Sequence, residues 1–214
     1  VMPTSNPDQI AAVTLNRHQD VMNLYVCNTR SLVCKSVITE KDDKYVKEDA
    51  YQQLKVIGNH FLLMSDRSGC NHLYWYTLTG QLVKQLTKGN DEVTGFYGYD
   101  AKTGSFYYRA KDGSPLRTAI FKTDLKGKTK KLSAQQGDNS AIFSNDLRYF
   151  INVYSNITTP PVTSICNSEG KTEKTLIDNA QLKERLQKAD IAKKELFTFK
   201  TSDGVELNGW MMKP

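Results

Sequence analysis

The serine, histidine and cysteine side chains are the groups through which this sequence could perform nucleophilic or metal chemistry. Serine hydrolases of the α/β type carry the nucleophile in a G-x-S-x-G turn, which exposes its hydroxyl beside backbone N–H groups that stabilise the oxyanion. No glycine in this chain has a serine two positions later. The three histidines, His18, His60 and His72, lie in turn-like or strand-edge contexts, where we expect structural or solvent-facing roles. The sequence therefore predicts no catalytic residue in this chain.

The four cysteines form no C-x-x-C pair and have no histidine at metal-ligand spacing, which argues against a zinc site or any other metal. Cys27 and Cys34 flank an expected hairpin turn at Thr29 to Leu32. A tight two-residue loop would make them a hydrogen-bonded pair with Cα atoms about 5.5 Å apart, so a cross-strand disulfide is one alternative. We favour free, buried thiols, and the redox compartment stays undecided. No cofactor is predicted.

The chain is basic, with a formal charge of +6 and a pI near 9.0. Clustered Lys and Arg are the electrostatic footprint of nucleic-acid binding. The densest cluster, Lys126–Lys131, is short and does not interleave aromatic residues. We interpret it as a solvated hairpin edge, because lysines on exposed strands discourage edge-to-edge pairing. No nucleic-acid partner is predicted.

Apolar residues are numerous but never form a run near the 18 or so residues of a membrane span, and no signal-peptide pattern is present at the N-terminus. Eleven Tyr and eight Phe set the composition apart from that of disordered chains, which are poor in aromatics. We expect a folded chain without a membrane span.

A repeat runs along the sequence. Each copy reads as an apolar strand, a polar turn, a second strand of alternating apolar residues, a glycine-containing turn and a third strand ending in an apolar residue. The copies begin at His60, Ser105 and Arg148, with a weaker one at Ile10. Their turn glycines are Gly80, Gly127 and Gly170, spaced 47 and 43 residues apart. A repeat of about 40 to 50 residues built from antiparallel strands is typical of β-propeller blades.

The sequence thus predicts an all-β fold, a partial β-propeller of about three to four antiparallel four-stranded blades, followed by one short helix and a C-terminal hairpin. Short strands at 92–99 and 140–144 are expected as the innermost or outermost strand of a blade. The alternative is a β-sandwich or meander whose hairpins merely resemble one another. We place the blades at 8–55, 56–100, 101–138 and 139–178.

The pattern changes after the last copy. Residues 180–189 are strong helix formers preceded by the capping candidates Asp178 and Asn179, which predicts a short surface helix at 179–189. Two strand-like segments then flank Asp203-Gly204, a strong hairpin signal. We therefore predict a domain boundary near residue 190, between a propeller domain at 1–190 and a hairpin at 191–214. Trp75 and Trp210 are expected to be core aromatics.

Several stretches carry a likeness to a known family. They are "FLLMSDRSGCNHLYWYTLTGQLVKQLTKGNDEVTGFYGYD", "FYYRAKDGSPLRTAIFKTDLKGKTKKLS" and "YFINVYSNITTPPVTSICNSEGK". In this order they resemble the later propeller blades of dipeptidyl peptidase IV-type enzymes of the prolyl oligopeptidase family. The closing T-x-D-G-x-x-L-x-G-W hairpin resembles the strand pair with which that family enters its α/β-hydrolase domain. The likeness covers residues 50–214 well and the first 50 loosely. The chain departs from it at Gly69-Cys70-Asn71 and at Gly137-Asp138-Asn139.

The resemblance implies a segment of a longer enzyme, a serine dipeptidyl peptidase that releases X-Pro and X-Ala dipeptides from peptide N-termini. The propeller would gate and orient the peptide, and the absent hydrolase domain would carry the Ser-Asp-His triad, so this chain alone should be inactive. Adjacent Glu-Glu, which the family uses to bind the substrate amine, is absent as well. The family also implies a homodimeric parent located outside the cytoplasm, periplasmic or secreted.

One residue is a candidate for substrate binding. Tyr45 lies in the linker "DDKYVKED", which in relatives runs near the active-site opening, where an aromatic ring could contact a peptide side chain. The alternative is a tyrosine that fastens the linker to the blade edge. A different class of function also stays open, namely a stand-alone propeller-like module that binds a protein partner.

Overall fold

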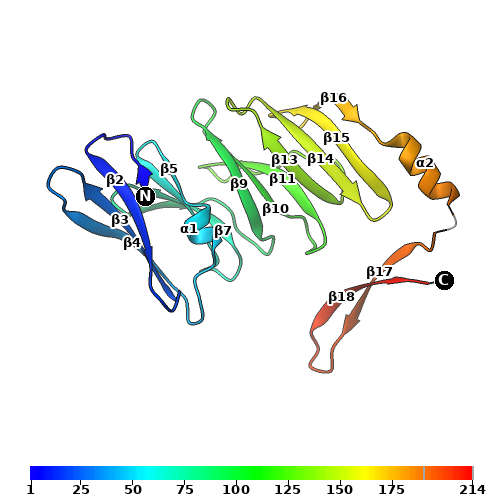
Figure 1. Cartoon of the computed structure of the whole chain (residues 1–214), viewed down its shortest axis with the longest axis horizontal. Coiled ribbons are helices and arrows are strands. Elements are labelled where there is room, and N and C mark those ends of the chain that lie inside the picture. Colours follow the sequence, from blue (N-terminus) through cyan, green and yellow to red (C-terminus); the bar gives the residue numbers. More distant parts are fainter. Residues whose placement is uncertain (190, 214) are drawn as a thin grey trace.

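The computed structural model describes residues 1–189 and 191–213, which form four antiparallel sheets of four strands each and one two-stranded hairpin (Figure 1). In every four-stranded sheet the strands pair in sequence order. This confirms the predicted partial propeller, and we number its blades in chain order. Blade 1 contains β1 (Met2–Pro3), β2 (Gln9–Leu15), β3 (Val21–Asn28) and β4 (Cys34–Lys41), and blade 2 contains β5 (Lys55–Ile57), β6 (His60–Ser65), β7 (His72–Thr77) and β8 (Leu82–Gln85).

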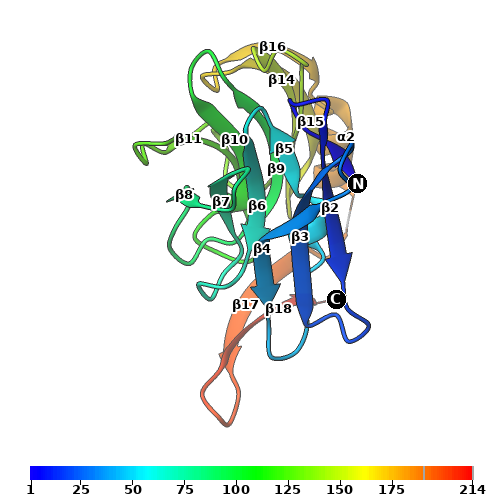
Figure 2. The same ribbon diagram turned by 90° about the vertical axis from the view of Figure 1, so that its left-hand side faces the viewer.

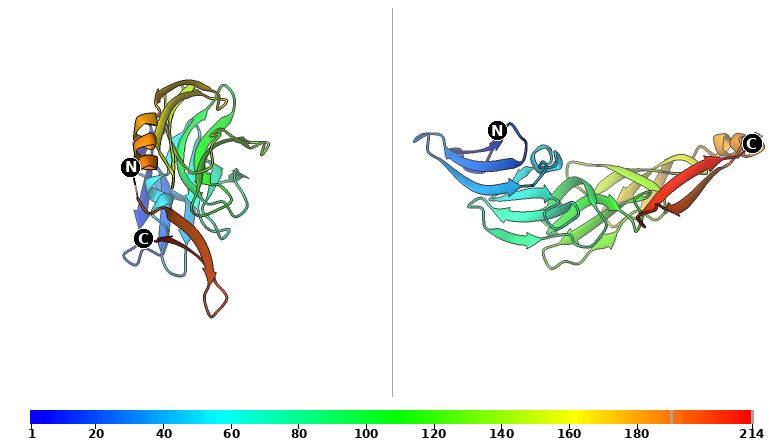
Figure 3. Two further views of the ribbon diagram at one scale, coloured as in Figure 1. Left: turned by 90° about the vertical axis from the view of Figure 1, so that its right-hand side faces the viewer. Right: turned by 90° about the horizontal axis from the view of Figure 1, so that it is seen from below.

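The second half of the chain repeats this plan and ends in a different arrangement. Blade 3 contains β9 (Val93–Asp100), β10 (Ser105–Lys111), β11 (Thr118–Asp124) and β12 (Lys130–Lys131), and blade 4 contains β13 (Asp138–Phe143), β14 (Tyr149–Asn156), β15 (Thr159–Asn167) and β16 (Thr172–Ile177). Helix α1 (Asp49–Gln52) connects blades 1 and 2, and α2 (Ala180–Lys188) leads to the hairpin of β17 (Lys194–Lys200) and β18 (Glu206–Met212). Seen from below, the blades follow one another along the molecule (Figure 3).

Two blade limits differ from the sequence assignment, and the first is the start of blade 1, because β1 lies before residue 8 and pairs with β2. Residues 93–100 were placed at the end of the second blade, but strand β9 pairs with β10 and opens blade 3. Each copy of the repeat begins in the sequence at the second strand of a blade. The first strand of that blade is therefore counted with the preceding copy. As expected, 92–99 and 140–144 supply edge strands, since β9 and β13 each lie at one edge of their sheet. The predicted domain boundary falls on residue 190, and the predicted hairpin ends at residue 214; both lie outside the described residues.

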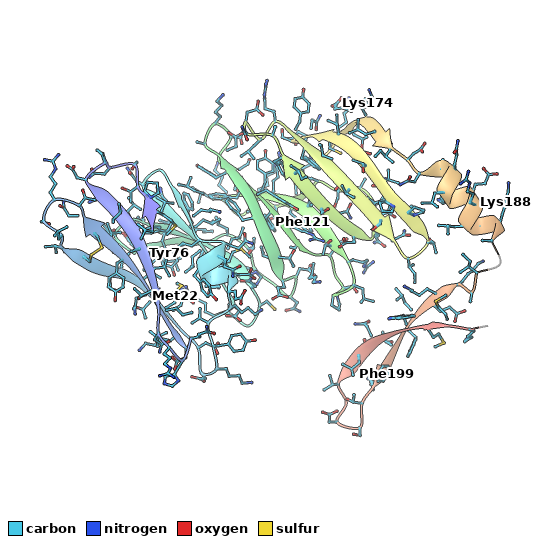
Figure 4. All side chains as sticks on the ribbon, in the orientation of Figure 1. Met22, Tyr76, Phe121, Lys174, Lys188 and Phe199 are labelled. Atoms are coloured by element: carbon cyan, nitrogen blue, oxygen red, sulfur yellow. A yellow bond between two sulfur atoms is a disulfide. The ribbon has the colours of Figure 1, made fainter. Side chains whose placement is uncertain are left out.

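The core consists of three apolar layers, one between each pair of successive blades. In β6, alternate side chains face opposite neighbours, because Phe61 and Leu63 pack with blade 1 whereas Leu62 and Met64 pack with blade 3. Met22 of blade 1 and Tyr76 of blade 2 belong to the first layer (Figure 4). The inner blades are therefore buried on both faces, which explains why β6 is apolar without interruption from Phe61 to Met64 and β10 from Phe106 to Tyr108.

Helix α2 lies on the surface and has no buried residue. The carboxylate of Asp178 accepts the backbone N–H of Ala180 at 3.0 Å, but the N-cap position is held by Asn179, whose side chain makes no capping hydrogen bond. The side chain of Asn179 instead donates to the carbonyl of Pro161 at 2.7 Å and so ties the start of the helix to blade 4. Among the described residues, no helix combines the length and the apolar character needed to cross a membrane.

The two tryptophans have opposite environments. Trp75 is 3% exposed and packs in the layer between blades 2 and 3, as predicted. Trp210 is 60% exposed, so its assignment to the core was wrong. Alternation along a strand shows which residues share a face, but a two-stranded hairpin supplies no second layer to cover that face.

The cysteines also correct an expectation. Cys27 and Cys34 form a disulfide rather than free thiols. Asn28 donates its N–H to the carbonyl of Val33, so the loop between β3 and β4 has four residues instead of two. This register makes Cys27 and Cys34 a non-hydrogen-bonded pair, the closer of the two antiparallel pairings, with Cα atoms 4.0 Å apart. Cys70 and Cys166 are free.

Candidate functional site

The strand order places two kinds of connection at one end of the blades. In a four-stranded antiparallel meander, the turn between the second and third strands and the linker to the next blade leave from the same end. We call this the linker end. It holds the turns 16–20, 66–71, 112–117 and 157–158 and the linkers 42–54, 86–92 and 132–137. The candidate residue Tyr45 belongs to this end.

Tyr45 points into solvent, with 60% of its surface exposed. Its backbone N–H donates to a carboxylate oxygen of Asp42 at 3.2 Å, which shapes the turn. The neighbouring Val46 is buried in the layer between blades 1 and 2, and its N–H donates to the carbonyl of Gln19 at 2.7 Å. Val46 therefore fastens the linker to the blade, and the tyrosine ring stays free to contact a ligand.

A polar cluster holds three connections of the linker end together. The ammonium group of Lys47 lies 2.6 Å from a carboxylate oxygen of Glu92 and 3.7 Å from one of Asp66. These residues come from the linker after blade 1, the turn inside blade 2 and the linker after blade 2. The hydrogen bond to Glu92 raises the pKa of Lys47, although partial burial opposes it. Lys47 therefore stays charged and fixes the linker that carries Tyr45.

Asn71 continues this cluster into the protein. It is 1% exposed, and its side-chain NH₂ donates to the Asp49 carboxylate at 2.9 Å and to the Val93 carbonyl at 3.0 Å. Burial raises the pKa of Asp49, which the positive charge of Lys47 partly offsets. The carbonyl oxygen of the Asn71 side chain has no hydrogen-bond partner among the described residues. Asn71 therefore positions α1 against the start of blade 3.

The histidines serve packing. His72 is buried, and its ring nitrogens lie 3.1 Å from the Thr87 hydroxyl and 3.1 Å from the Gly89 carbonyl, which orders the linker after blade 2. His60 stacks on Trp75 with ring centroids 4.7 Å apart. His18 is exposed in the turn between β2 and β3. Within the described residues, no group of three His, Cys, Asp or Glu side chains is arranged to hold a metal ion.

Sequence reasoning missed an ion pair between the buried Glu40 of blade 1 and the exposed Arg67 of blade 2. The Arg67 guanidinium contacts the carboxylate of Glu40, which also accepts the Ser65 hydroxyl at 2.8 Å. The same guanidinium lies over the ring of Tyr74, 4.6 Å from its centroid. Glu40 ends one strand and Arg67 lies in a turn of the next blade, and no spacing in the sequence relates them. The pair is a structural tie at the linker end.

The linker end also forms an apolar cleft with the C-terminal hairpin. Its volume is about 620 Å³, and it lies between the turns of blades 3 and 4 and one face of the hairpin. The large apolar side chains that line it are exposed, namely Leu116, Ile157, Leu196 and Trp210. The ammonium of Lys194 lies 4.7 Å from the centroid of the Trp210 ring. Seven polar residues also line the cleft, among them Arg117 and Asp138, so it can bind an apolar side chain that has polar groups beside it.

Comparison with known proteins gives one consistent result. The family model described as the dipeptidyl peptidase IV (DPP IV) N-terminal region matches residues 4–161. Dipeptidyl peptidase 4 of Trichophyton rubrum is 27% identical over 96% of this chain, and that of Arthroderma otae is 28% identical over 96%. The crystal structure of Porphyromonas gingivalis dipeptidyl peptidase 4 superimposes with a TM-score of 0.93 and 39% identity over 99% of this chain. The chain spans 28% of the length of the two fungal relatives and 30% of the crystallised chain.

Proposed function

The chain belongs to the family of the dipeptidyl peptidase IV N-terminal region, and from this premise we propose that it forms the later, non-catalytic propeller blades of a serine dipeptidyl peptidase. The observation that carries the proposal is the agreement with P. gingivalis dipeptidyl peptidase 4 over 99% of the chain, including the C-terminal hairpin. The proposed reaction of the whole protein is the release of X-Pro and X-Ala dipeptides from peptide N-termini. This chain contains no G-x-S-x-G turn, so the nucleophile would come from the hydrolase domain.

The proposed role of the blades is to gate and orient the peptide at the linker end. Two observations support the placement of the substrate at the linker end. The hairpin lies there, and the exposed apolar side chains on both of its faces need a further layer, which the hydrolase domain would supply. They include Leu196, Phe197, Trp210 and Phe199, the last of which is labelled in Figure 4. The exposed ring of Tyr45 would then stand beside the active-site opening, on a linker fixed by Lys47 and Val46.

We also propose that the protein acts outside the cytoplasm, in the periplasm or after secretion, and as a homodimer. The Cys27–Cys34 disulfide supports the location, because such bonds persist in oxidising compartments and are rare in the cytosol. The dimer rests on the family alone and is tested by light scattering of the intact protein.

Activity is tested with the intact protein and with this chain alone. The intact protein should release the chromophore from Gly-Pro- and Gly-Ala-p-nitroanilide and lose activity with a serine-directed fluorophosphonate, whereas this chain should release none. An intact protein that is folded but inactive on both substrates contradicts the proposal. Cleavage by the chain alone contradicts its non-catalytic role.

The gating role is tested at Tyr45. In the intact protein, Tyr45→Ala should raise KM for peptides of six or more residues by about twofold to tenfold, which corresponds to the ~0.5–1.5 kcal/mol of one aromatic contact. The value of kcat and the kinetics of a dipeptide p-nitroanilide should stay unchanged. Tyr149→Ala is the matched control, because Tyr149 is also exposed but begins β14 at the opposite end of blade 4. Equal effects of both variants, or none from Tyr45→Ala, would exclude Tyr45 from substrate binding.

A further inference from the structure

The turns between the third and fourth strands of blades 2, 3 and 4 contain equivalent glycines but pack differently. Gly80, Gly127 and Gly170 have φ values of +86°, +86° and +85°. A Cβ atom at Gly80 would lie 1.9 Å from the carbonyl oxygen of Val37 in blade 1, and one at Gly170 would lie 2.4 Å from that of Leu132, directly after β12. A Cβ at Gly127 would meet nothing within 4 Å. The turn of blade 3 therefore does not rest on blade 2.

The charges at these turns differ in the same way. In blade 4 the residue before the glycine is Glu169, whose carboxylate contacts Lys122 and lies 2.8 Å from the ammonium of Lys130, both in blade 3. In blade 3 the equivalent residue is Lys126. It lines a groove together with Lys84 on the last strand of blade 2. An attractive contact between blades 3 and 4 is thus replaced by like charges between blades 2 and 3.

The groove at this open junction has a volume of about 480 Å³. The turn after β11 extends outward on the same side as β8 (Figure 2). The aromatic pair Tyr108 and Phe121, with ring centroids 5.6 Å apart, forms part of its wall. Four lysines and one carboxylate line it: Lys84, Lys88, Lys111, Lys126 and Asp91.

Within the described residues the groove keeps an excess of positive charge, because four lysines line it with a single carboxylate. None of the four lysines forms a salt bridge with a residue in 1–189 or 191–213. Lys111 donates to the backbone carbonyl of Pro115 at 2.8 Å, and Asp91 accepts the N–H of Gly113 at 2.8 Å. A cleft lined by charges of one sign and bounded by apolar walls concentrates its field and attracts counter-ions.

We propose that this groove binds an anion with two or more sulfate or phosphate groups, which bridges Lys84 of blade 2 and Lys126 of blade 3. The anion takes the place that the Glu169 carboxylate occupies between blades 3 and 4. Tyr108 is 5% exposed, and one face of the partly buried Phe121 stacks on it with an interplanar angle of 19°. The groove therefore does not offer the series of open ring faces on which successive bases of a single-stranded nucleic acid stack. The ligand is therefore a small polyanion or a sulfated glycan.

The test uses the intact protein and isothermal titration calorimetry at an ionic strength of about 0.15 M, where the Debye length is about 8 Å. Inorganic pyrophosphate and a heparin tetrasaccharide are the probes. Lys126→Glu should weaken binding about tenfold or more, or 1.4 kcal/mol. Lys128→Glu is the matched control, since the substitution makes the same charge change in the same turn but Lys128 does not line the groove. The affinity of this variant should stay within about twofold of the wild-type value, because exposed charges away from the site are screened. Lys84→Gln, on the opposite wall, should also weaken binding.

The outcomes distinguish a glycan from a small anion as the ligand, and they include two results that would overturn the proposal. Tenfold tighter binding of the tetrasaccharide identifies a glycan site, and similar affinities identify a site for small phosphorylated or sulfated compounds. Failure of both probes to bind the wild-type protein overturns the proposal. Equal weakening by Lys126→Glu and Lys128→Glu also overturns it, since that result reports general surface charge. Peptidase activity serves as the folding control for every variant.

Discussion

The three turn glycines allow the contact between blades to be measured separately from backbone strain. We consider Gly80→Ala, Gly127→Ala and Gly170→Ala in the intact protein. Their φ values differ by only one degree, so each alanine meets the same left-handed backbone, at a cost of about 1–2 kcal/mol. Gly127→Ala should show this cost alone, because its Cβ meets open space.

The other two substitutions add a collision with the preceding blade. At Gly80 the new Cβ would lie 1.9 Å from a backbone oxygen, 1.1 Å inside the 3.0 Å that real Cβ contacts essentially never undercut. A backbone oxygen cannot rotate away as a side chain can, so the blades must separate. Overpacking of this kind costs about 1–3 kcal/mol. Gly80→Ala should therefore lose about 2–5 kcal/mol, and Gly170→Ala, with a contact of 2.4 Å, somewhat less.

Hydrogen exchange with mass spectrometry is the appropriate assay, because it reports the opening free energy of individual segments in a protein of several domains. Peptides from β4 and β8 should lose protection in Gly80→Ala, and peptides from β12 and β16 in Gly170→Ala. In Gly127→Ala the loss should stay within blade 3. Three variants with equal and equally distributed losses would refute the reasoning, because they would show that backbone strain alone decides the effect.

Two further predictions concern the Cys27–Cys34 disulfide and the ion pairs of Glu169. Replacing both Cys27 and Cys34 by serine should lower the opening free energy of β3 and β4 by up to about 2.5 kcal/mol, because the disulfide no longer reduces the loop-closure entropy for a separation of seven residues. Peptide mapping without reducing agent should find the two cysteines linked. Alkylation of both cysteines in the unreduced protein would contradict the bond. Hydrogen bonds from Lys122 and Lys130 lower the pKa of Glu169 below its ordinary value of 4.5. The stability that the Glu169 carboxylate gives to the folded state is therefore complete above pH 4.5 and is lost as the pH falls through the lowered pKa. Glu169→Gln should thus cost about 0.2–1 kcal/mol per exposed pair at pH 7, and hydrogen exchange of the blade 4 peptides should show this difference shrinking towards pH 3; a difference that persists there would exclude the ion pairs as its cause.

The fold was accessible from the sequence because its signals are local and recur. Turn glycines at similar intervals and apolar strands between them predict the blades, and strong helix formers with Asp178 before them predict α2. Blade limits were less certain, since a periodic pattern fixes the period but not the strand at which each unit begins. This phase error placed residues 93–100 in the wrong blade.

The contacts that local patterns could not supply depend on loop length or on neighbouring sheets. The disulfide follows from a four-residue loop, which sets the register of Cys27 and Cys34. The Glu40–Arg67 pair joins two blades and depends on how they pack. Exposure of Trp210 depends on whether a further layer covers the hairpin, which the strand pattern does not encode. Tyr45 was found from family resemblance, and its substrate-binding role stays a prediction.

The three junctions between blades are stabilised by different means, which explains how one of them can remain open at its rim. Blades 1 and 2 share the Glu40–Arg67 pair, and blades 3 and 4 share the Glu169 contacts. Between blades 2 and 3, Trp75 and Phe106 pack edge to face with ring centroids 5.0 Å apart. Aromatic pairs of this kind contribute about 0.5–1.5 kcal/mol beyond their burial, so the inner part of this junction is well stabilised. The outer part can therefore keep unpaired lysines close together, and an anion bound there should stabilise the junction without being required for folding.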